Sequence, residues 1–391
     1  MRVFAAAMLL PVCLLTATPI YTVVDLGSLG VGSISAATAL NSSGHAAGWS
    51  VTATQSMQAF QSSGGGIAQA LASSSPGRAQ GINDSGQIVG TRYDADGNAE
   101  AVRWSADGLA VSGLGGGVDS YAMAINANGS VVGAANGRAV RFTDSGPVNI
   151  PVSGTWSTAN AVNAWGAVAG TTQSRYGQFQ AFTAGPAGGA ATLIGSLGGG
   201  ASYGQAINSN GLVAGGSTTV RGYLHAFLYA RGKLQDLGTL GGGNNSSAYG
   251  VDDEGRVVGY SQDAAGDSRA FLFENGQMRD LNQLIAADMG WRLSEASAIN
   301  NNGQIVGFGM KNGVQHAFRL DPIAMAFASS ARAALVQDIA APSPSLAIPE
   351  PSALLLFTTA AGAAGIAMGS IHRRRRNQQK KPLAPYDDFC G

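Results

Sequence analysis

A ten-residue phrase recurs along this chain at nearly regular intervals. Residues 81–90 read GINDSGQIVG, residues 206–215 read AINSNGLVAG and residues 298–307 read AINNNGQIVG. Aligned on its Asn or Asp, the phrase occurs seven times at spacings of 37 to 48 residues, at Asn41, Asn83, Asn126, Asn163, Asn208, Asp252 and Asn300. Such a period predicts a chain built from copies of one supersecondary unit.

The phrase itself has the chemistry of a β-hairpin. Apolar residues such as Ile299 and Val306 flank the motif N-x-x-G. The Asn side chain can bond to its own backbone in an Asx-turn, and the glycine accepts the positive φ of a short turn. Each copy has this glycine three residues after the Asn or Asp, and a further glycine four residues later. We therefore expect a strand on each side of every turn.

Two further segments complete the unit. About 18 residues after the Asn come triplets such as QAF at 180–182 and HAF at 316–318, although the third copy, RAV at 138–140, comes after 13. Aromatic and β-branched residues at this offset predict a third strand. A fourth is expected in segments such as LQDLGTLGGG at 234–243, which end in a glycine-rich connection to the next repeat.

Four short strands about every 43 residues predict an all-β, seven-bladed β-propeller. The repeat region begins with a fourth-strand segment, YTVVDLGSLG at 21–30, and ends with a third-strand segment, GVQHAFRLDP at 313–322. We expect these two pieces to pair and close the ring, which removes the exposed sheet edges. An open β-solenoid is the alternative, because solenoids are also built from repeats.

The HAF triplets, DLGTLGG and A-I-N-x-x-G-x-V-V-G resemble the HAF family of probable extracellular repeats. The resemblance covers about Tyr21 to Pro322, and DLN at 280–282 followed by GWR at 290–292 resembles the usual final unit of that family. It implies an extracellular location and a repeated architecture, and it leaves the ligand open.

The N-terminal segment predicts export. Arg2 is followed by thirteen apolar residues, Val3 to Leu15, which are too few to span a bilayer and suit the hydrophobic region of a signal peptide. We assign residues 1–18 to this signal peptide, to be removed by signal peptidase, and residues 21–322 to the propeller.

The C-terminal segment predicts a membrane-anchored precursor. After an Ala/Pro/Ser linker at 323–348, residues 352–371 are uncharged and mainly apolar. At about 1.5 Å per residue they reach roughly 30 Å as a helix, the thickness of a hydrocarbon core. The arginines that follow predict a cytoplasmic tail at 377–391 and an exported body. A plain membrane anchor is one interpretation of this segment.

A more specific interpretation comes from three elements in order: a Pro-Glu-Pro motif, the apolar span and an arginine block. Together, over residues 349–376, they resemble the PEP-CTERM sorting signal, although the tail after the arginines is longer than usual. The resemblance implies processing by an exosortase and a bacterial secreted or cell-surface location. The residues that carry it are Pro349, Glu350, Pro351, Arg373, Arg374, Arg375 and Arg376.

Charge and cysteine usage exclude several classes of partner and site. Between residues 3 and 372 there are 16 basic and 21 acidic residues, a mildly acidic balance that argues against nucleic acid as a partner. Cys13 and Cys390 lie near opposite ends of the chain, so the repeats contain neither a disulfide nor a cysteine metal site.

The sequence offers no strong catalytic, cofactor or metal motif, and we predict none of these sites. His225 and His316 occupy the first position of HAF triplets, where other repeats carry Gln, Arg or Glu, which favours a structural role. Asp94, Asp96 and Asn98 are spaced like part of a calcium loop but lack its full ligand set, so a solvated turn is the preferred interpretation.

The predicted function is non-enzymatic binding of an exopolysaccharide or a protein in the cell-surface matrix, through loops on one face of the propeller. Similar loops on seven blades would combine weak contacts. The alternative is a polysaccharide lyase or glycosidase at the central channel, which would need two carboxylates converging there. A purely architectural spacer is a third hypothesis.

Overall fold

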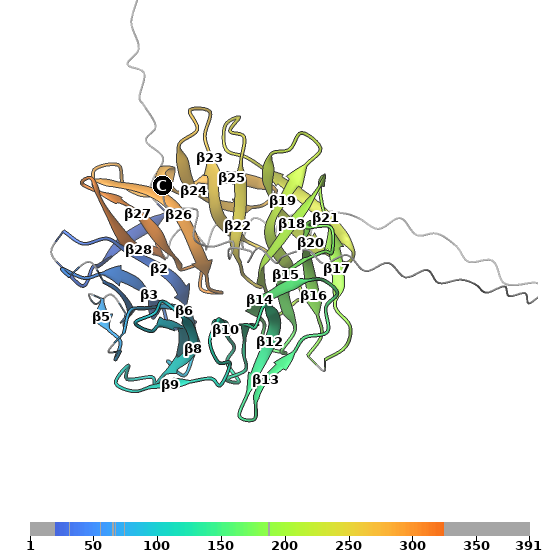
Figure 1. Cartoon of the computed structure of the whole chain (residues 1–391). Coiled ribbons are helices and arrows are strands. Elements are labelled where there is room, and N and C mark those ends of the chain that lie inside the picture. Colours follow the sequence, from blue (N-terminus) through green and yellow to red (C-terminus); the bar gives the residue numbers. More distant parts are fainter. Residues whose placement is uncertain are drawn as a thin grey trace, which may run out of the picture. The chain divides into compact units, whose positions relative to one another are not determined.

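A computed structural model describes residues 20–323, except residues 31, 55, 65, 67, 74 and 187. This part of the chain contains seven four-stranded antiparallel sheets arranged in a ring around a common centre (Figure 1). The chain is a seven-bladed β-propeller, which confirms the prediction and replaces the solenoid alternative.

The first strand of each blade lies nearest the axis and contacts the first strand of both neighbouring blades. These strands are β2 (Ser35–Leu40), β6 (Gly77–Ile82), β10 (Ser120–Ile125), β14 (Trp156–Val162), β18 (Gly198–Ile207), β22 (Ser246–Val251) and β26 (Trp291–Ile299). The second strands are β3 (Ala46–Val51), β7 (Ile88–Tyr93), β11 (Val131–Ala135), β15 (Val168–Gln173), β19 (Val213–Thr219), β23 (Val257–Gln262) and β27 (Ile305–Lys311).

The outer half of each blade consists of its third and fourth strands. The third strands are β4 (Met57–Ser62), β8 (Ala99–Trp104), β12 (Arg138–Thr143), β16 (Phe179–Ala184), β20 (Leu224–Ala230), β24 (Ser268–Glu274) and β28 (Val314–Pro322). The fourth are β5 (Gln69–Ala70), β9 (Val111–Gly113), β13 (Gly146–Asn149), β17 (Thr192–Gly195), β21 (Lys233–Gly238), β25 (Gln277–Asp280) and, from the start of the repeats, β1 (Tyr21–Gly27). A 3₁₀ turn, η1 (Leu281–Gln283), follows β25.

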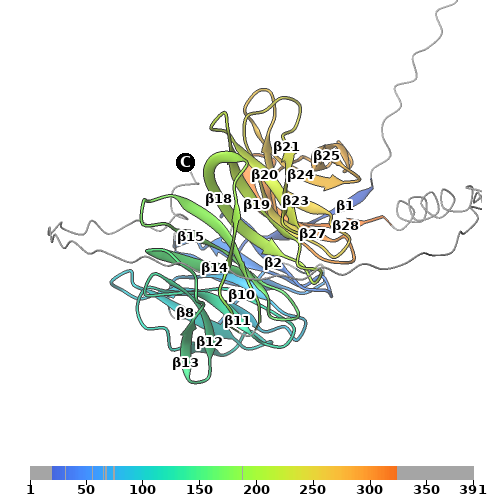
Figure 2. The ribbon, with the colours of Figure 1, turned by 90° about the vertical axis from the view of Figure 1, so that its right-hand side faces the viewer.

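The ring closes where β1 pairs with β28, from Tyr21 opposite Pro322 onward (Figure 2). The Asp25 carboxylate reinforces this pairing, because it accepts hydrogen bonds from Lys311 Nζ at 2.7 Å and from His316 Nδ1 at 3.0 Å. Burial by itself would raise the pKa of Asp25, but these bonds outweigh it and lower the pKa. The two terminal strands therefore complete one blade, as the sequence predicted.

The HAF triplet supplies the core between blades. Its alanine and its phenylalanine point to opposite sides of the third strand, and both are buried, as in Ala226 and Phe227. Its first residue stays partly exposed and can pair with the Asp of D-L-G in the fourth strand; His225 Nδ1 lies 2.9 Å from the Asp236 carboxylate. The recurrence of these letters thus follows from repeated packing.

The second glycine of each phrase is required by a close backbone approach. Every first strand carries a β-bulge two to four residues before its Asn or Asp, as between Ala122 and Ala124. The bulge brings the carbonyl oxygen of the residue five before the Asn or Asp against the second strand. A Cβ on the facing glycine would lie only 1.9–2.1 Å from that oxygen at Gly48, Gly90, Gly133, Gly170, Gly215, Gly259 and Gly307.

The early third strand of one repeat also has a local cause. Asn136 and Gly137 have φ values of 50° and 69° and connect β11 to β12 in a two-residue turn. Most blades use a longer connection at this place, such as residues 94–98 between β7 and β8. A type I′ turn needs positive φ at both positions, which Asn-Gly tolerates.

The remaining sequence predictions concern segments outside the described residues. These are the signal peptide at 1–18, the linker from residue 324, the residues of the sorting signal, the span at 352–371 and the tail at 377–391. Within the described part of the chain, no helix has the length and apolar character needed to cross a membrane.

Candidate functional site

The propeller has two faces with different chemistry. We call the Asn-turn face the one that carries the connections between strands 1 and 2, and between strands 3 and 4, of each blade. We call the loop face the opposite one, which carries the connections between strands 2 and 3 and those between blades. Because neighbouring strands are antiparallel, these two sets of connections lie at opposite ends of the strands.

On the Asn-turn face, each Asn or Asp of the repeated phrase holds its own turn. Asn126 Oδ1 accepts hydrogen bonds from the backbone N–H groups of Asn128 at 3.1 Å and Ser130 at 2.9 Å. The Asn126 side chain is buried, although the turn residues that donate to it are exposed, so these bonds fix the shape of the turn at its buried end. The same arrangement occurs around Asp252, whose carboxylate accepts from Glu254 and Arg256.

The amide nitrogens of the same asparagines join neighbouring blades. Asn126 Nδ2 donates to the backbone carbonyl of Asn163 at 2.9 Å, and Asn300 Nδ2 closes the circle by donating to the carbonyl of Asn41 at 2.9 Å. Six of the seven repeats make this contact: Asn41, Asn83, Asn126, Asn163, Asn208 and Asn300. We call this circle the Asn ring. Sequence reasoning found its members but missed the bonds between blades.

The seventh position, Asp252, has no amide and cannot donate. Arg256 lies beside it instead, and its Nε donates to the Asp252 carboxylate. Its Nη2 also lies 3.5 Å from the carbonyl of Asn301 in the next blade. Burial raises the pKa of Asp252, and the bonds from Arg256 oppose that shift. The Asp–Arg pair therefore takes the place of one asparagine.

The Asn ring surrounds a cavity of about 280 Å³ on the axis, above a ring of aliphatic residues that includes Ile82 and Ile207. Asp84, Asp252 and Asp253 all line it, so carboxylates do converge at the channel. Each one already accepts hydrogen bonds. Asp84 accepts from the Ser42 backbone, and Asp253 accepts from the backbone of Ser209 and from Asn301 Nδ2, both at 2.8 Å.

Further along the first strands, the bulge residues also connect blades. Thr38 Oγ1 donates to the Ala79 carbonyl, and Asn160 Nδ2 donates to the Gly204 carbonyl, both at 2.8 Å.

Glu295 lies two residues before the bulge residue Ser297 in β26. Burial raises the pKa of Glu295 to about 7, although a hydrogen bond with Ser297 opposes the shift. One carboxyl near the axis therefore titrates close to neutral pH.

Replacing Glu295 by glutamine should stabilise the protein at alkaline pH. The folded pKa lies above the usual 4.5, so the folded state holds the proton more tightly than the unfolded state. The stability that this proton contributes is present below about pH 4.5 and is lost as the pH rises through 7. Urea titrations should show Glu295→Gln gaining about 2 kcal/mol over the wild type at pH 8 and little at pH 4.5. Parallel pH profiles would contradict this assignment.

The loop face exposes large apolar side chains. Tyr176 (77% exposed), Val220 (84%) and Tyr223 lie in the connections between strands 2 and 3 of two neighbouring blades. Behind them, the rings of Trp156, Phe179 and Tyr203 follow one another at centroid distances of 6.2 and 5.6 Å. Ile34, Val118 and Met289 are exposed in the connections between blades.

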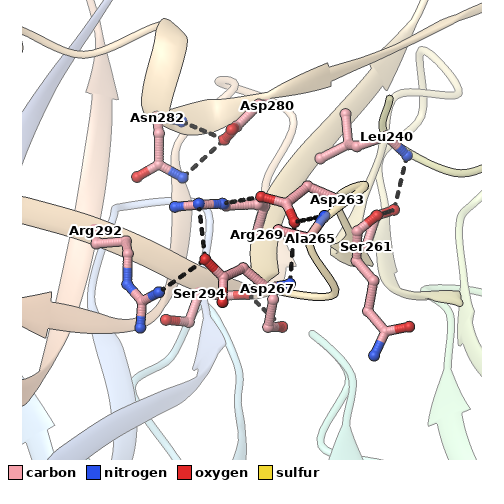
Figure 3. Close-up of polar contacts among 12 residues, drawn as sticks. Leu240, Ser261, Asp263, Ala265, Asp267, Arg269, Asp280, Asn282, Arg292 and Ser294 are labelled. Atoms are coloured by element: carbon pink, nitrogen blue, oxygen red, sulfur yellow. Dashed lines mark hydrogen bonds and ion pairs between the residues drawn. The ribbon is translucent and has the colours of Figure 1, made fainter. Parts of the chain in front are cut away.

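The acidic turns of the loop face are held by internal bonds. Asp263 accepts from the backbone of Ala265 and Asp267 and from Arg269 Nε, and Asp267 pairs with Arg269 and Arg292 (Figure 3). Hydrogen bonds from the side chain and backbone of Asn98 lower the pKa of Asp94. Among the described residues, no three His, Cys, Asp or Glu side chains are grouped so as to hold a metal ion.

Comparison with known proteins shows similarity of fold alone. No protein-family model and no curated protein matches the sequence. A Mycobacterium tuberculosis puromycin-hydrolysing peptidase is similar in structure, at 12% identity and a TM-score of 0.50, over 72% of this chain and 50% of that one. YCF48 bound to D1 peptide has 13% identity and a TM-score of 0.46, over 79% of this chain and 96% of its own.

TolB from Acinetobacter baumannii is 12% identical, with a TM-score of 0.43, over 71% of this chain. The match spans 63% of TolB, so the chain corresponds to less than two thirds of TolB and to half of the peptidase. These likenesses concern the propeller fold alone.

Proposed function

We propose that this protein is an exported, non-enzymatic binding propeller that holds an extracellular polysaccharide across its loop face. One observation carries the proposal: six large exposed apolar side chains of the described residues, among them Tyr176 and Tyr223, lie in the connections of that face. Two, Leu109 and Trp165, lie on the Asn-turn face, where the asparagines of the repeated phrase join the blades. Exposed apolar side chains with polar surroundings are typical of binding surfaces.

The chemistry of the loop face suits a sugar polymer. An aromatic ring offers an apolar face and, in tyrosine, a hydroxyl that can bond to a wet ligand. Tyr176 and Tyr223 come from adjacent blades, so a single polysaccharide molecule could contact both side chains. Several weak contacts of this kind add up on one polymer through their effective concentration. The leader-like N-terminus and the resemblance to exported repeat and sorted proteins support the extracellular setting.

The hydrogen bonds of the axial carboxylates favour binding over hydrolysis. Asp84, Asp252 and Asp253 are all acceptors for neighbouring groups in the ring, which leaves them poorly placed to act on a substrate. Burial raises the pKa of both Asp252 and Glu295, but Asp252 is paired with Arg256, which leaves Glu295 as the better candidate for a general acid. A glycosidase at the channel would therefore depend on Glu295.

The test is retention of the purified full-length protein on extracellular polysaccharide from the source organism, with assay of reducing ends in the same tubes. The wild type should be retained without releasing reducing ends. A Tyr176→Ala/Tyr223→Ala variant should lose most of this retention. Trp165→Ala, which removes an exposed aromatic side chain from the Asn-turn face, should be retained like the wild type. Release of sugar ends that disappears in Glu295→Gln would establish the enzymatic alternative. If the wild type is not retained, the polysaccharide proposal is wrong, and a protein becomes the ligand to test next.

A further inference from the structure

We propose that a cavity of the second blade, the blade of β6–β9, binds one or two units of a neutral sugar. It is lined by β7, β8, the turn between them and the connections that join this blade to its neighbours, on the loop face. The inference rests on the proposed function, because it places a specific subsite for a polysaccharide on the same face. The cavity has a volume of about 510 Å³, within the range usual for small-ligand pockets.

The walls of the cavity combine polar and apolar groups from four segments. Arg92 and Tyr93 end β7, and Glu100 lies in β8 across the same hairpin. Asn98 comes from the turn between these strands, and Val118 comes from the connection to the next blade. Charged, amide, phenol and aliphatic groups therefore face one space.

The central polar pair is held in a fixed position. Arg92 Nε and Nη2 both lie 2.8 Å from Glu100 Oε2. A Cβ at Gly113 on β9 would lie 2.3 Å from Glu100 Oε1, so glycine at this position leaves room for the carboxylate. The side chains of Arg92 and Glu100 remain 34% and 39% exposed. A ligand would meet a preorganised pair rather than ordering two long side chains, which reduces the entropy cost of binding.

The rim of the cavity is also preorganised. Asp94 Oδ1 accepts from the backbone N–H of Asp96 and Asn98, and its Oδ2 accepts from Asn98 Nδ2 at 2.9 Å. The Tyr93 backbone N–H donates to the Pro76 carbonyl, which fixes the end of β7. Among the described residues the Tyr93 hydroxyl bonds to none, so it can serve a ligand.

The charge of the cavity selects a neutral ligand. Its walls contain one cation, Arg92, and two carboxylates, Asp94 and Glu100. The one cation is already paired, so a phosphate or an acidic sugar would meet a net negative site. Neighbouring hydroxyl groups of a sugar both donate and accept, and their spacing matches that of paired carboxylate oxygens or guanidinium nitrogens. Tyr93 and Val118 supply surfaces for the C–H side of the ring.

The corresponding turn of another blade shows what distinguishes this cavity. There Asp263 and Asp267 occupy the positions of Asp94 and Asn98, but Arg269 lies over both, and Arg292 of the next blade approaches Asp267 (Figure 3). Arg269 thus stands at the position of Glu100 and bonds to both acidic residues of its own turn. We therefore expect the neutral-sugar subsite in the blade of β6–β9 and not at the turn of Asp263.

The test is saturation-transfer NMR on the full-length protein, with glucose, galactose and mannose as neutral probes and glucuronate as the acidic probe. At least one neutral sugar should show transfer, and glucuronate should show less. Tyr93→Ala and Glu100→Gln should each weaken binding about tenfold, which corresponds to about 1.4 kcal/mol. Trp165→Ala should bind as the wild type does. Thermal unfolding should show that both cavity variants remain folded.

The outcomes separate this inference from the proposed function. Polysaccharide retention with unchanged sugar binding in Tyr93→Ala and Glu100→Gln would overturn the cavity and leave the loop face as the binding surface. The opposite result is loss of neutral-sugar transfer in both variants, without any polysaccharide retention by the wild type. It would support sugar binding in the cavity and overturn the proposal that the loop face binds a polysaccharide. Stronger transfer to glucuronate, or no transfer to any probe, would also overturn the cavity.

Discussion

Replacement of Gly133 by alanine should destabilise the propeller by about 3 kcal/mol. The new Cβ would lie 1.9 Å from the carbonyl oxygen of Tyr121, an atom held by the bulge of the innermost strand. Neither strand can move away freely, because β10 and β11 are both packed against the next blade. Urea unfolding of the full-length protein should show a lower midpoint with an unchanged slope.

Gly189→Ala is the matched control for this change. Gly189 is exposed, lies outside the strands, and an added Cβ there would contact nothing within 4 Å. It should unfold like the wild type. Equal midpoints for Gly133→Ala and Gly189→Ala would mean that the repeated second glycine has a role other than relief of this contact.

Loss of one member of the Asn ring should have an effect of similar size. Asn126→Ala removes a buried donor to the Asn163 carbonyl and an acceptor for two partly buried backbone N–H bonds of its own turn. Buried groups left without partners cost about 1–3 kcal/mol each, and partial access of water reduces the sum, so we expect a loss of about 2–4 kcal/mol. The measurement is again the midpoint of urea unfolding.

The Asp252–Arg256 pair suggests a variant that isolates the contact between blades. Asn126→Asp keeps the turn acceptor but removes the donor and buries a charge, so it should also destabilise. Adding Ser130→Arg, four residues later, recreates the spacing of Asp252 and Arg256 and should recover part of the loss. If no stability is recovered, the Asp–Arg pair can replace an asparagine only in the blade that contains Asp252 and Arg256.

The fold was predictable because its information is local and repeated. The turn chemistry of N-x-x-G, the alternation in the HAF strand and the spacing of the markers each describe one blade without reference to another. Ring closure was also predictable, since a fourth strand at the start and a third at the end complete one blade. The pairing of Tyr21 with Pro322 confirms that inference.

The functional features were less accessible, because they depend on contacts between blades. Nothing in the sequence says that Asn126 Nδ2 reaches a carbonyl 37 residues away, since that depends on the angle between neighbouring sheets. Asp252 was the one visible sign of a special contact, because it is the only acidic residue among the seven Asn or Asp positions and Arg256 follows it four residues later. The cavity beside Arg92 and Glu100 combines one blade with the connections on both sides of it, and Glu295 titrates near neutral pH only because of its burial.

The central claim is that one face of the propeller holds the ring together and the opposite face binds. Hydrogen–deuterium exchange of the full-length protein, with and without the retained polysaccharide, tests it most directly. The account predicts slower exchange in the loop-face connections at residues 94–98, 174–178 and 220–223, with no change at the turns that follow Asn83, Asn163 and Asn208. Slower exchange confined to those Asn turns would contradict it and would place the ligand at the axial cavity.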